Sequence, residues 1–181
     1  MNELLYARGT VDYRPGEGII ERYYGADGKP CLNKHGFHCA RVALSRDSLV
    51  NTYFGLSDEP VLFWDVEMAN GGYHKQTVYL DKQGHVSGIR HFGTDSQPVY
   101  IQPGLHFMAY ETDDIGRPTS IICYGTDGRK VNTNTNVCEV RLRYAGGKEV
   151  EKTFYDNRGR RVNAVIGYSR VTSRYENSRL V

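Results

Sequence analysis

Short hydrophobic runs alternate with polar, glycine-rich segments along the whole chain, and none of the runs has the spacing of an amphipathic helix. Ten runs of six to nine residues are rich in Ile, Val, Thr, Tyr and Phe, which is typical of half-buried strands. They form two series, a first at 19–24, 49–54, 86–92, 119–124 and 149–155, and a second at 37–45, 73–81, 105–113, 137–145 and 168–176. With the opening segment, the pattern predicts about eleven strands and no helix.

Turn signals separate the runs. Runs of the first series end in tips such as YYGADG at 23–28 and CYGTDG at 123–128, and some runs of the second series end in DKQG at 81–84 or DDIG at 113–116. Gly, Asp, Asn and Ser favour such tips because they tolerate the left-handed conformation or close an Asx turn. Strands joined by links this short must be antiparallel neighbours, so the sequence predicts an all-β antiparallel meander.

A period of about 31 residues relates these elements to one another. The residue after the aromatic pair steps by 30, 38, 32 and 31 residues, through Gly25, Gly55, Gly93, Gly125 and Asp156. A single hairpin cannot bury its own face, so neighbouring copies must supply the core. The sequence therefore predicts one repeat domain, 1–181, that forms a long twisted sheet or a solenoid-like stack. It divides into a half copy, 1–18, and the copies 19–48, 49–85, 86–117, 118–148 and 149–181.

The second copy carries an insertion of six residues, because 17 residues separate Gly55 from Gly72 where the other copies have 11. The insertion holds the single Trp of the chain, in LFWDVEMANGG at 62–72. An insertion in one copy of a repeat usually maps to a loop, and loops carry binding. Trp64, beside Asp65 and Glu67, is therefore a candidate ligand anchor; the alternative is a hydrophobic plug over the adjacent strand end.

Aromatic residues at the ends of the first-series runs are the other candidates for binding. The chain has 14 Tyr residues, and the common role of such residues in a sheet is core and cross-strand packing. The alternative is a row of platforms for sugar rings or a peptide. The binding hypothesis names Tyr24, Tyr124 and Tyr155 in this row, together with Trp64 and with Tyr73 directly after the insertion.

Charge and hydropathy exclude two classes of partner. The formal net charge is +2, from 23 basic and 21 acidic residues, which gives no electrostatic case for nucleic acid or an anionic membrane. No apolar run reaches the length of a membrane span, so we expect no membrane insertion. The opening MNELLYARG lacks the charged and apolar regions of a signal peptide.

Three histidines occupy the same place in three copies, two residues after the inner Gly: His38, His74 and His106. Stacked copies would align them, and aligned imidazoles could bind a divalent metal. Equivalent positions are separated by two strands, about 9–10 Å, which is too far for shared ligation. We therefore expect no metal site.

The remaining chemistry-bearing residues form no catalytic motif. The four cysteines, Cys31, Cys39, Cys123 and Cys138, have no CxxC spacing; their even number permits two disulfides, but free, partly buried thiols are the expectation. No carboxylate pair, GxSxG or phosphate-binding glycine loop is found. The sequence predicts neither an enzyme nor a cofactor.

Longer stretches resemble a known repeat. YYGADGKPCLNKHGFHCARVALS at 23–45 and FYDNRGRRVNAVIGYSRVTSRYE at 154–176 resemble bacterial tyrosine–aspartate tandem repeats, of which those of Rhs-type proteins are best known, and the likeness covers about residues 17–179. The chain departs from the motif by having Gly in place of its Asp at 25, 55, 93 and 125. A shallower similarity, in TVYLDKQGHVSGI at 77–89, is to glucan- and choline-binding cell-wall repeats.

The resemblance implies a fold unit without catalytic residues, in an extracellular or cell-surface bacterial protein of which this chain is a part. We therefore expect a non-enzymatic repeat module that serves as a spacer or an adhesive surface, with a glycan or a protein on a cell surface as partner. The alternative function is a carbohydrate- or cell-wall-binding module that uses the Tyr rows and Trp64.

Overall fold

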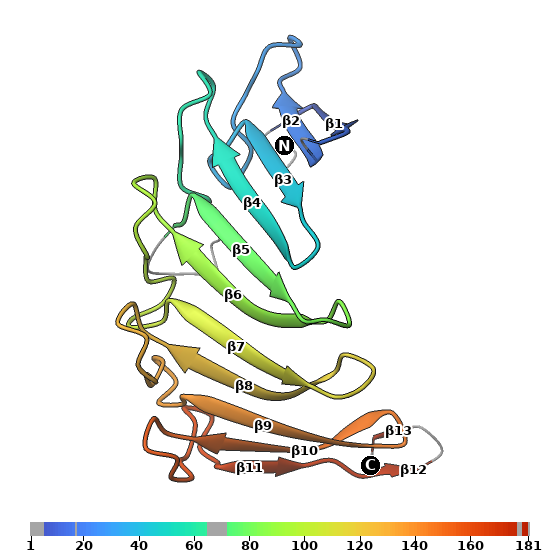
Figure 1. Cartoon of the computed structure of the whole chain (residues 1–181), viewed down its shortest axis with the longest axis vertical. Helices are drawn as coiled ribbons and strands as arrows, with labels where there is room; N and C mark the ends of the chain where they lie inside the picture. The colour runs from blue at the N-terminus through green and yellow to red at the C-terminus, as the bar shows by residue number, and fades with distance from the viewer. Residues whose placement is uncertain (1–5, 17, 65–71, 177–178, 181) are drawn as a thin grey trace.

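The centre of the molecule is a single antiparallel sheet of eleven strands in which every strand pairs with its neighbours in sequence (Figure 1). The computed structural model describes residues 6–16, 18–64, 72–176 and 179–180. The strands are β1 (Arg8–Arg14), β2 (Gly18–Tyr24), β3 (Cys39–Leu44), β4 (Ser48–Phe54), β5 (Lys75–Leu80), β6 (Val86–Phe92), β7 (Phe107–Thr112), β8 (Pro118–Tyr124), β9 (Glu139–Ala145), β10 (Lys148–Tyr155) and β11 (Arg170–Thr172). A separate pair, β12 (Tyr175–Glu176) and β13 (Arg179–Leu180), follows. The predicted all-β antiparallel meander is confirmed, and the sheet is open, with β1 and β11 at its two ends.

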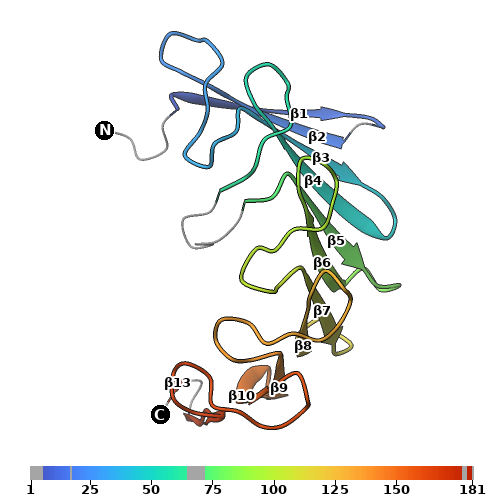
Figure 2. The same ribbon diagram turned by 90° about the vertical axis from the view of Figure 1, so that its left-hand side faces the viewer.

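Two kinds of connection alternate along the meander. Short turns join β1 to β2, β3 to β4, β5 to β6, β7 to β8 and β9 to β10, at one side of the sheet in Figure 1. Long loops leave the other side, between β2 and β3, β4 and β5, β6 and β7, β8 and β9, and β10 and β11. In Figure 2 the strands form a narrow, curved band, and the long loops lie toward the viewer. We call the sheet face that these loops cover the loop face, and the opposite one the open face.

The five long loops share three backbone hydrogen bonds. In the first loop, the N–H of Gly25 donates to the carbonyl of Lys29 at 2.9 Å, that of Cys31 to Tyr23 at 3.1 Å, and that of Asn33 to Phe37 at 2.9 Å. The corresponding donors in the other loops are Gly55, Val61 and Phe63; Gly93, Val99 and Ile101; Gly125, Val131 and Thr133; and Asp156, Val162 and Ala164. Each loop is therefore two consecutive tight turns, the first at the strand end and the second folded back over the loop face.

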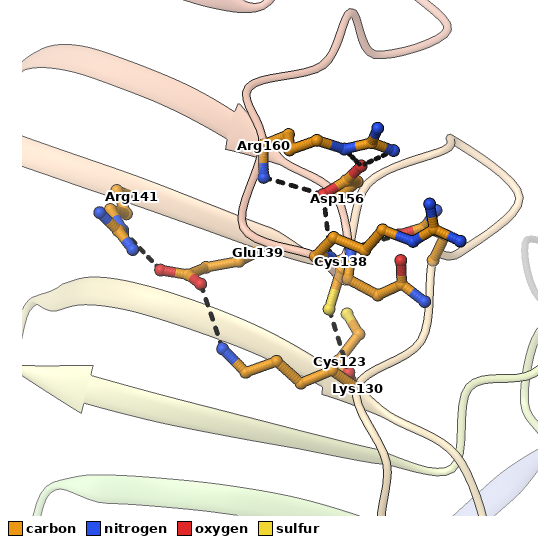
Figure 3. Close-up of polar contacts among 10 residues, drawn as sticks. Cys123, Lys130, Cys138, Glu139, Arg141, Asp156 and Arg160 are labelled. Atoms are coloured by element: carbon orange, nitrogen blue, oxygen red, sulfur yellow. Dashed lines mark hydrogen bonds and ion pairs between the residues drawn. The ribbon is translucent and has the colours of Figure 1, made fainter.

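A side-chain carboxylate accepts a backbone hydrogen bond in the first turn of each long loop. In the fifth loop, Oδ1 of Asp156 accepts hydrogen bonds from the N–H groups of Arg158 and Arg160, at 2.9 Å each, while Oδ2 pairs with the Arg160 guanidinium (Figure 3). In the first loop, Oδ1 of Asp27, two residues further along, accepts from the N–H of Lys29 at 3.0 Å. Asp95 and Asp127 accept in the same way in the third and fourth loops, and in the second loop Glu59 accepts from the N–H of Ser57 at 2.7 Å. The turn thus keeps a carboxylate where Gly replaces the motif Asp.

The core lies between the loop face and the second turns of the long loops. Its main cluster consists of Tyr23, Phe37, Ala40, Tyr53, Tyr73, Ile101 and Leu105, and a smaller cluster consists of Val137, Phe154 and Ala164. The ring of Phe37, from the first loop, lies 5.6 Å from that of Tyr23 on β2 and 4.9 Å from that of Tyr53 on β4. The loop side chain Phe37 therefore bridges two successive hairpins, and bridging of this kind gives a single layer of strands a core.

Candidate binding surface

The last two residues of each first-series strand divide between the two faces of the sheet. Successive side chains of a strand point to opposite faces. Tyr23 and Tyr53 are buried in the loop-face core, so the residues that follow them, Tyr24 and Phe54, lie on the open face. The second members of the five pairs, Tyr24, Phe54, Phe92, Tyr124 and Tyr155, are all half-buried and form a row along that face.

Cations from the neighbouring strand cover the rings of this row. The guanidinium of Arg8, which is the Cα partner of Tyr24 across β1 and β2, lies 4.7 Å from the centre of the Tyr24 ring. Lys75 likewise lies over its register partner Phe92 at 4.5 Å, whereas Arg41 over Phe54 at 4.1 Å and Arg141 over Tyr155 at 4.4 Å each stand two residues from the register partner of the ring. Beside the row, Arg90 lies over its register partner Phe107 on β7 at 4.6 Å. The open face is thus a ladder of alternating aromatic rings and cations.

The three aligned histidines fasten the loops to the strands. Nδ1 of His38 lies 2.8 Å from the Tyr23 carbonyl, Nδ1 of His74 lies 2.8 Å from the Tyr53 carbonyl, and Nδ1 of His106 lies 3.2 Å from the Val99 carbonyl. A carbonyl only accepts, so each Nδ1 carries the proton. Each imidazole also meets a ring of the aromatic row edge to face, with centroids 5.3–5.6 Å apart. Within the described ranges, no three His, Cys, Asp or Glu side chains gather around a point where a metal ion could bind.

A hollow on the open face lies between β6, β7 and β8. It has a volume of about 450 Å³, and its walls include Arg90, Phe92, His106, Phe107 and Tyr124, with residues 125–128 of the fourth long loop at its rim. The rings of Phe107 and Tyr124 lie 5.6 Å apart at an angle of 31°. One predicted residue, Tyr124, therefore belongs to a groove with two further aromatic walls and a cation.

A glycine sets the position of Phe107 in this groove. Phe107 lies across Gly88 of β6, where a Cβ atom would come within 2.5 Å of the Phe107 ring. The ring thus occupies the space that a side chain at position 88 would fill, and this places it below the Arg90 guanidinium. A glycine inside a strand commonly marks such a close approach.

Arg90 supplies the positive charge of the groove, and Asp127 at the rim supplies a negative one. Arg41 pairs with Asp58, and Arg141 with Glu139, whereas Arg90 is exposed and pairs with no carboxylate among the residues that the structure describes. Burial, together with the positive charge of Arg90, lowers the pKa of His106. The hollow can therefore stack a flat ring or the apolar face of a sugar against its aromatic walls while Arg90 donates to a carboxylate or hydroxyl.

The residues around the insertion form a different environment. Trp64 is 52% exposed. Its backbone N–H donates to the His35 carbonyl at 3.1 Å, and its backbone carbonyl lies 2.8 Å from Nδ1 of His35. Tyr73 is 4% exposed, and its ring lies 5.3 Å from that of Phe63 and 4.6 Å from that of His91. Trp64 is therefore available at the surface, while Tyr73 belongs to the core. Asp65 and Glu67, named with Trp64, lie outside the described residues.

The five predicted site residues do not form one site. Tyr24, Tyr124 and Tyr155 are spread along the open face, and Trp64 and Tyr73 lie at loops of the loop face. Sequence reasoning missed Arg90 and Phe107, although their neighbourhood gave a signal. Arg90 and Phe92 flank a buried residue, His91, so alternation places both on the face opposite the core.

A second hollow, of about 330 Å³, lies on the loop face between the two core clusters and is apolar. Leu105, Met108, Cys123, Cys138 and Phe154 are among its lining residues. It occupies the region beneath the fourth and fifth long loops, where the smaller core cluster begins.

Comparison of the chain with protein-family models, with curated proteins and with solved structures finds no match. Over the described ranges, no helix has the length and apolar character needed to cross a membrane.

Proposed function

We propose that the chain is a non-enzymatic binding module built from tandem β-hairpins, part of a secreted or surface-exposed bacterial protein, and that it presents its open face to a partner. The recurrence of the same loop hydrogen bonds in five loops supports its origin as copies of one unit. The observation that carries the binding function is the ladder of rings and cations on the open face, which includes the groove around Arg90. In its simplest form the module is a spacer whose long sheet offers an adhesive protein-binding surface.

The groove favours carbohydrate as a more specific partner. Aromatic walls next to a cation and a hydroxyl suit a sugar ring, because the ring stacks through its C–H groups while its polar groups accept and donate hydrogen bonds. Tyr124 and Phe107 would provide the platform and Arg90 the charge, with the Thr126 hydroxyl at the rim. Trp64 offers a second exposed ring on the other face of the sheet.

A glycan array and a pull-down with bacterial cell wall test this function directly. Binding that is lost in Tyr124→Ala and Phe107→Ala would support the groove, and binding lost in Trp64→Ala would support the insertion. Tyr13→Ala is the matched control, because Tyr13 is 74% exposed and lies on the first hairpin, away from both places. Binding that all four variants retain, or no binding to any glycan, would leave the protein-binding spacer as the supported function.

A further inference from the structure

Cys123 on β8 and Cys138, directly before β9, are neighbours across two antiparallel strands. The N–H of Cys123 donates to the carbonyl of Cys138 at 2.8 Å, one step beyond the register pair Ile122 and Glu139. Sγ of Cys138 lies 3.5 Å from the carbonyl oxygen of Cys123. Figure 3 shows the two thiols side by side at the loop end of these strands.

This pair of positions recurs in every hairpin, but only one hairpin has two thiols there. Equivalent backbone hydrogen bonds run from Tyr23 to His38 at 3.0 Å, from Tyr53 to His74 at 3.1 Å and from Phe154 to Ser169 at 3.0 Å. The third hairpin has His91 and His106 at these positions, with Nδ1 of His91 3.5 Å from the His106 carbonyl. The fold thus brings together the side chains at these two positions, and in the fourth hairpin they are cysteines.

We propose that Cys123 and Cys138 form an intrachain disulfide that pins the fourth long loop to the sheet, with a peroxide as the oxidant. Cα atoms of directly opposed antiparallel residues lie about 4.5–5.5 Å apart, which falls within the range of about 4.4–6.8 Å that a disulfide spans. The reduced structure already holds Sγ of Cys138 against the backbone of Cys123.

Oxidation of the pair by hydrogen peroxide proceeds in two steps. The Cys123 thiolate attacks one oxygen of hydrogen peroxide, so that an S–O bond forms, the O–O bond breaks, and the departing hydroxide takes up a proton as water. Sulfur of Cys138 then attacks Sγ of the sulfenic acid; the S–S bond forms, the S–O bond breaks, and the second oxygen leaves as water with the Cys138 proton. Two thiols and one peroxide give one disulfide and two waters, with two electrons passed from sulfur to oxygen.

The apolar hollow on the loop face gives a small oxidant a route to the pair. Both Cys123 and Cys138 line it. The other two cysteines lack this arrangement, because Cys31 packs against the loop-face core while Cys39, opposite Phe54 in the register, lies on the open face. They provide an internal comparison within the same chain.

Burial controls how fast the pair reacts. Burial, and to a lesser extent the nearby Cys138, raises the pKa of the Cys123 thiol to about 12, and burial raises that of Cys138 as well. Because the thiolate is the nucleophile, oxidation by peroxide should be slow near neutral pH and accelerate about tenfold for each pH unit of increase.

Peptide mapping identifies the disulfide unambiguously. Trypsin does not cleave before Pro30 or Pro118, so the four cysteines fall in four different tryptic peptides, 23–34, 35–41, 91–129 and 131–141. The full chain is reduced, desalted, treated with hydrogen peroxide at pH 7 and pH 8, alkylated and digested without reductant. We expect an intact mass lower by about 2 Da, a dominant link between 91–129 and 131–141, and a melting midpoint raised by about 5–10 °C for a loop of this length.

Two variants and an unfolded control keep the test decisive. Cys138→Ser should abolish the link and remain folded, since Ser169 stands at the equivalent position of the fifth loop, whereas the double variant Cys31→Ser/Cys39→Ser should retain it. In urea, the Cys31–Cys39 link should dominate, because these two residues are closest in sequence. The proposal is overturned if peroxide treatment of the folded chain leaves both thiols of the pair free, oxidises them without linking them, or links them no faster than Cys31 to Cys39.

Discussion

The two faces of the sheet are made by the same strands, yet they use their side chains differently. On the loop face, Tyr53 lies under the second turns of the loops and contacts Phe37, Phe63 and Tyr73. On the open face, its chain neighbour Phe54 is covered by a single cation and the edge of His74. Both faces carry aromatic rows. Whether an aromatic ring is buried is therefore decided by which face the long loops cover.

The largest effect should come from emptying the loop face. Tyr53→Ala removes a 9% exposed ring from the centre of the core, and we expect a loss of about 3–5 kcal/mol in the free energy of unfolding. Phe54→Ala is the matched variant on the same strand and should cost about 1–2 kcal/mol, because it loses one cation–π contact and partial burial. Urea unfolding followed by circular dichroism measures both, and equal losses would contradict the distinction between the faces.

The next largest effect should be a loss of stability at acidic pH, caused by His91 in the loop-face core. His91 is 1% exposed, and burial lowers its pKa to about 4 from an ordinary value near 6.5. The unfolded chain therefore binds a proton more readily than the folded one, so stability is complete above about pH 6.5 and falls as the pH drops toward 4. The free energy of unfolding should fall by about 2–3 kcal/mol between pH 7 and pH 4. Urea midpoints measured across this range test the expectation.

His91→Tyr provides the control for this pH dependence, because Tyr23 and Tyr53 stand at the equivalent positions of two other hairpins. The variant should flatten the stability curve between pH 6.5 and 4 while leaving the core filled. A curve that stays as steep as that of the parent chain would assign the acid sensitivity to other groups.

Removing a capping carboxylate should destabilise the protein more at the buried turn of Asp156 than at the exposed turn of Asp27. Although burial opposes it, hydrogen bonds from Arg160 and Arg158 hold the pKa of Asp156 below its usual range, so this carboxylate stays ionised. Asp156→Ala orphans these donors at a 4% exposed site, whereas Asp27→Ala affects a side chain that is 62% exposed. We expect a clearly larger fall in melting midpoint for Asp156→Ala, measured by thermal unfolding, and the reverse order would be inconsistent with this reading.

Replacing Arg90 should have the smallest effect on stability of these substitutions and a large effect on binding. Arg90→Gln on the open face removes an exposed charge without a carboxylate partner in the described chain, so the free energy of unfolding should change by less than about 0.5 kcal/mol. Affinity for acidic sugars should fall about tenfold or more, and that for neutral sugars much less, in titration calorimetry. Arg8→Gln, which changes an exposed cation over Tyr24 on the first hairpin, is the matched control, and an equal loss in both variants would argue against the groove.

The strand order and the aromatic row followed from the sequence because period-2 alternation and turn residues are local signals. The first-series strands match within one residue, as with the predicted 119–124 and the observed β8, Pro118–Tyr124. The second-series strands begin two residues later than predicted, at Cys39 rather than at 37. Phe37 belongs to the loop and plugs the core, and the backbone bends at His38, which bonds to strands on both sides. An apolar run does not distinguish a plug from a strand.

The candidate groove was harder to predict because it depends on long-range pairing. Tyr124 was named from its place in the row, but its partner Phe107 comes from the preceding strand, and the groove exists because Gly88 leaves room for that ring. For Tyr73 the position next to an insertion predicts a surface residue. The loop instead carries its side chain into the core. Core packing, the common role expected for the first-series aromatics, describes Tyr23, Tyr53 and Phe154, which are buried, rather than the residues that follow them.

Strictly sequential pairing also shapes how the molecule would respond to tension. Every strand contact in the described chain joins neighbours along the sequence, and no element closes the sheet or ties one end of it to the other. A pull on the two ends would load one hairpin junction at a time, so extension should proceed as a series of small, similar steps rather than one abrupt rupture. Such a sheet would behave as an extensible tether, in which each peeled hairpin lengthens the link while the remaining hairpins keep their cores.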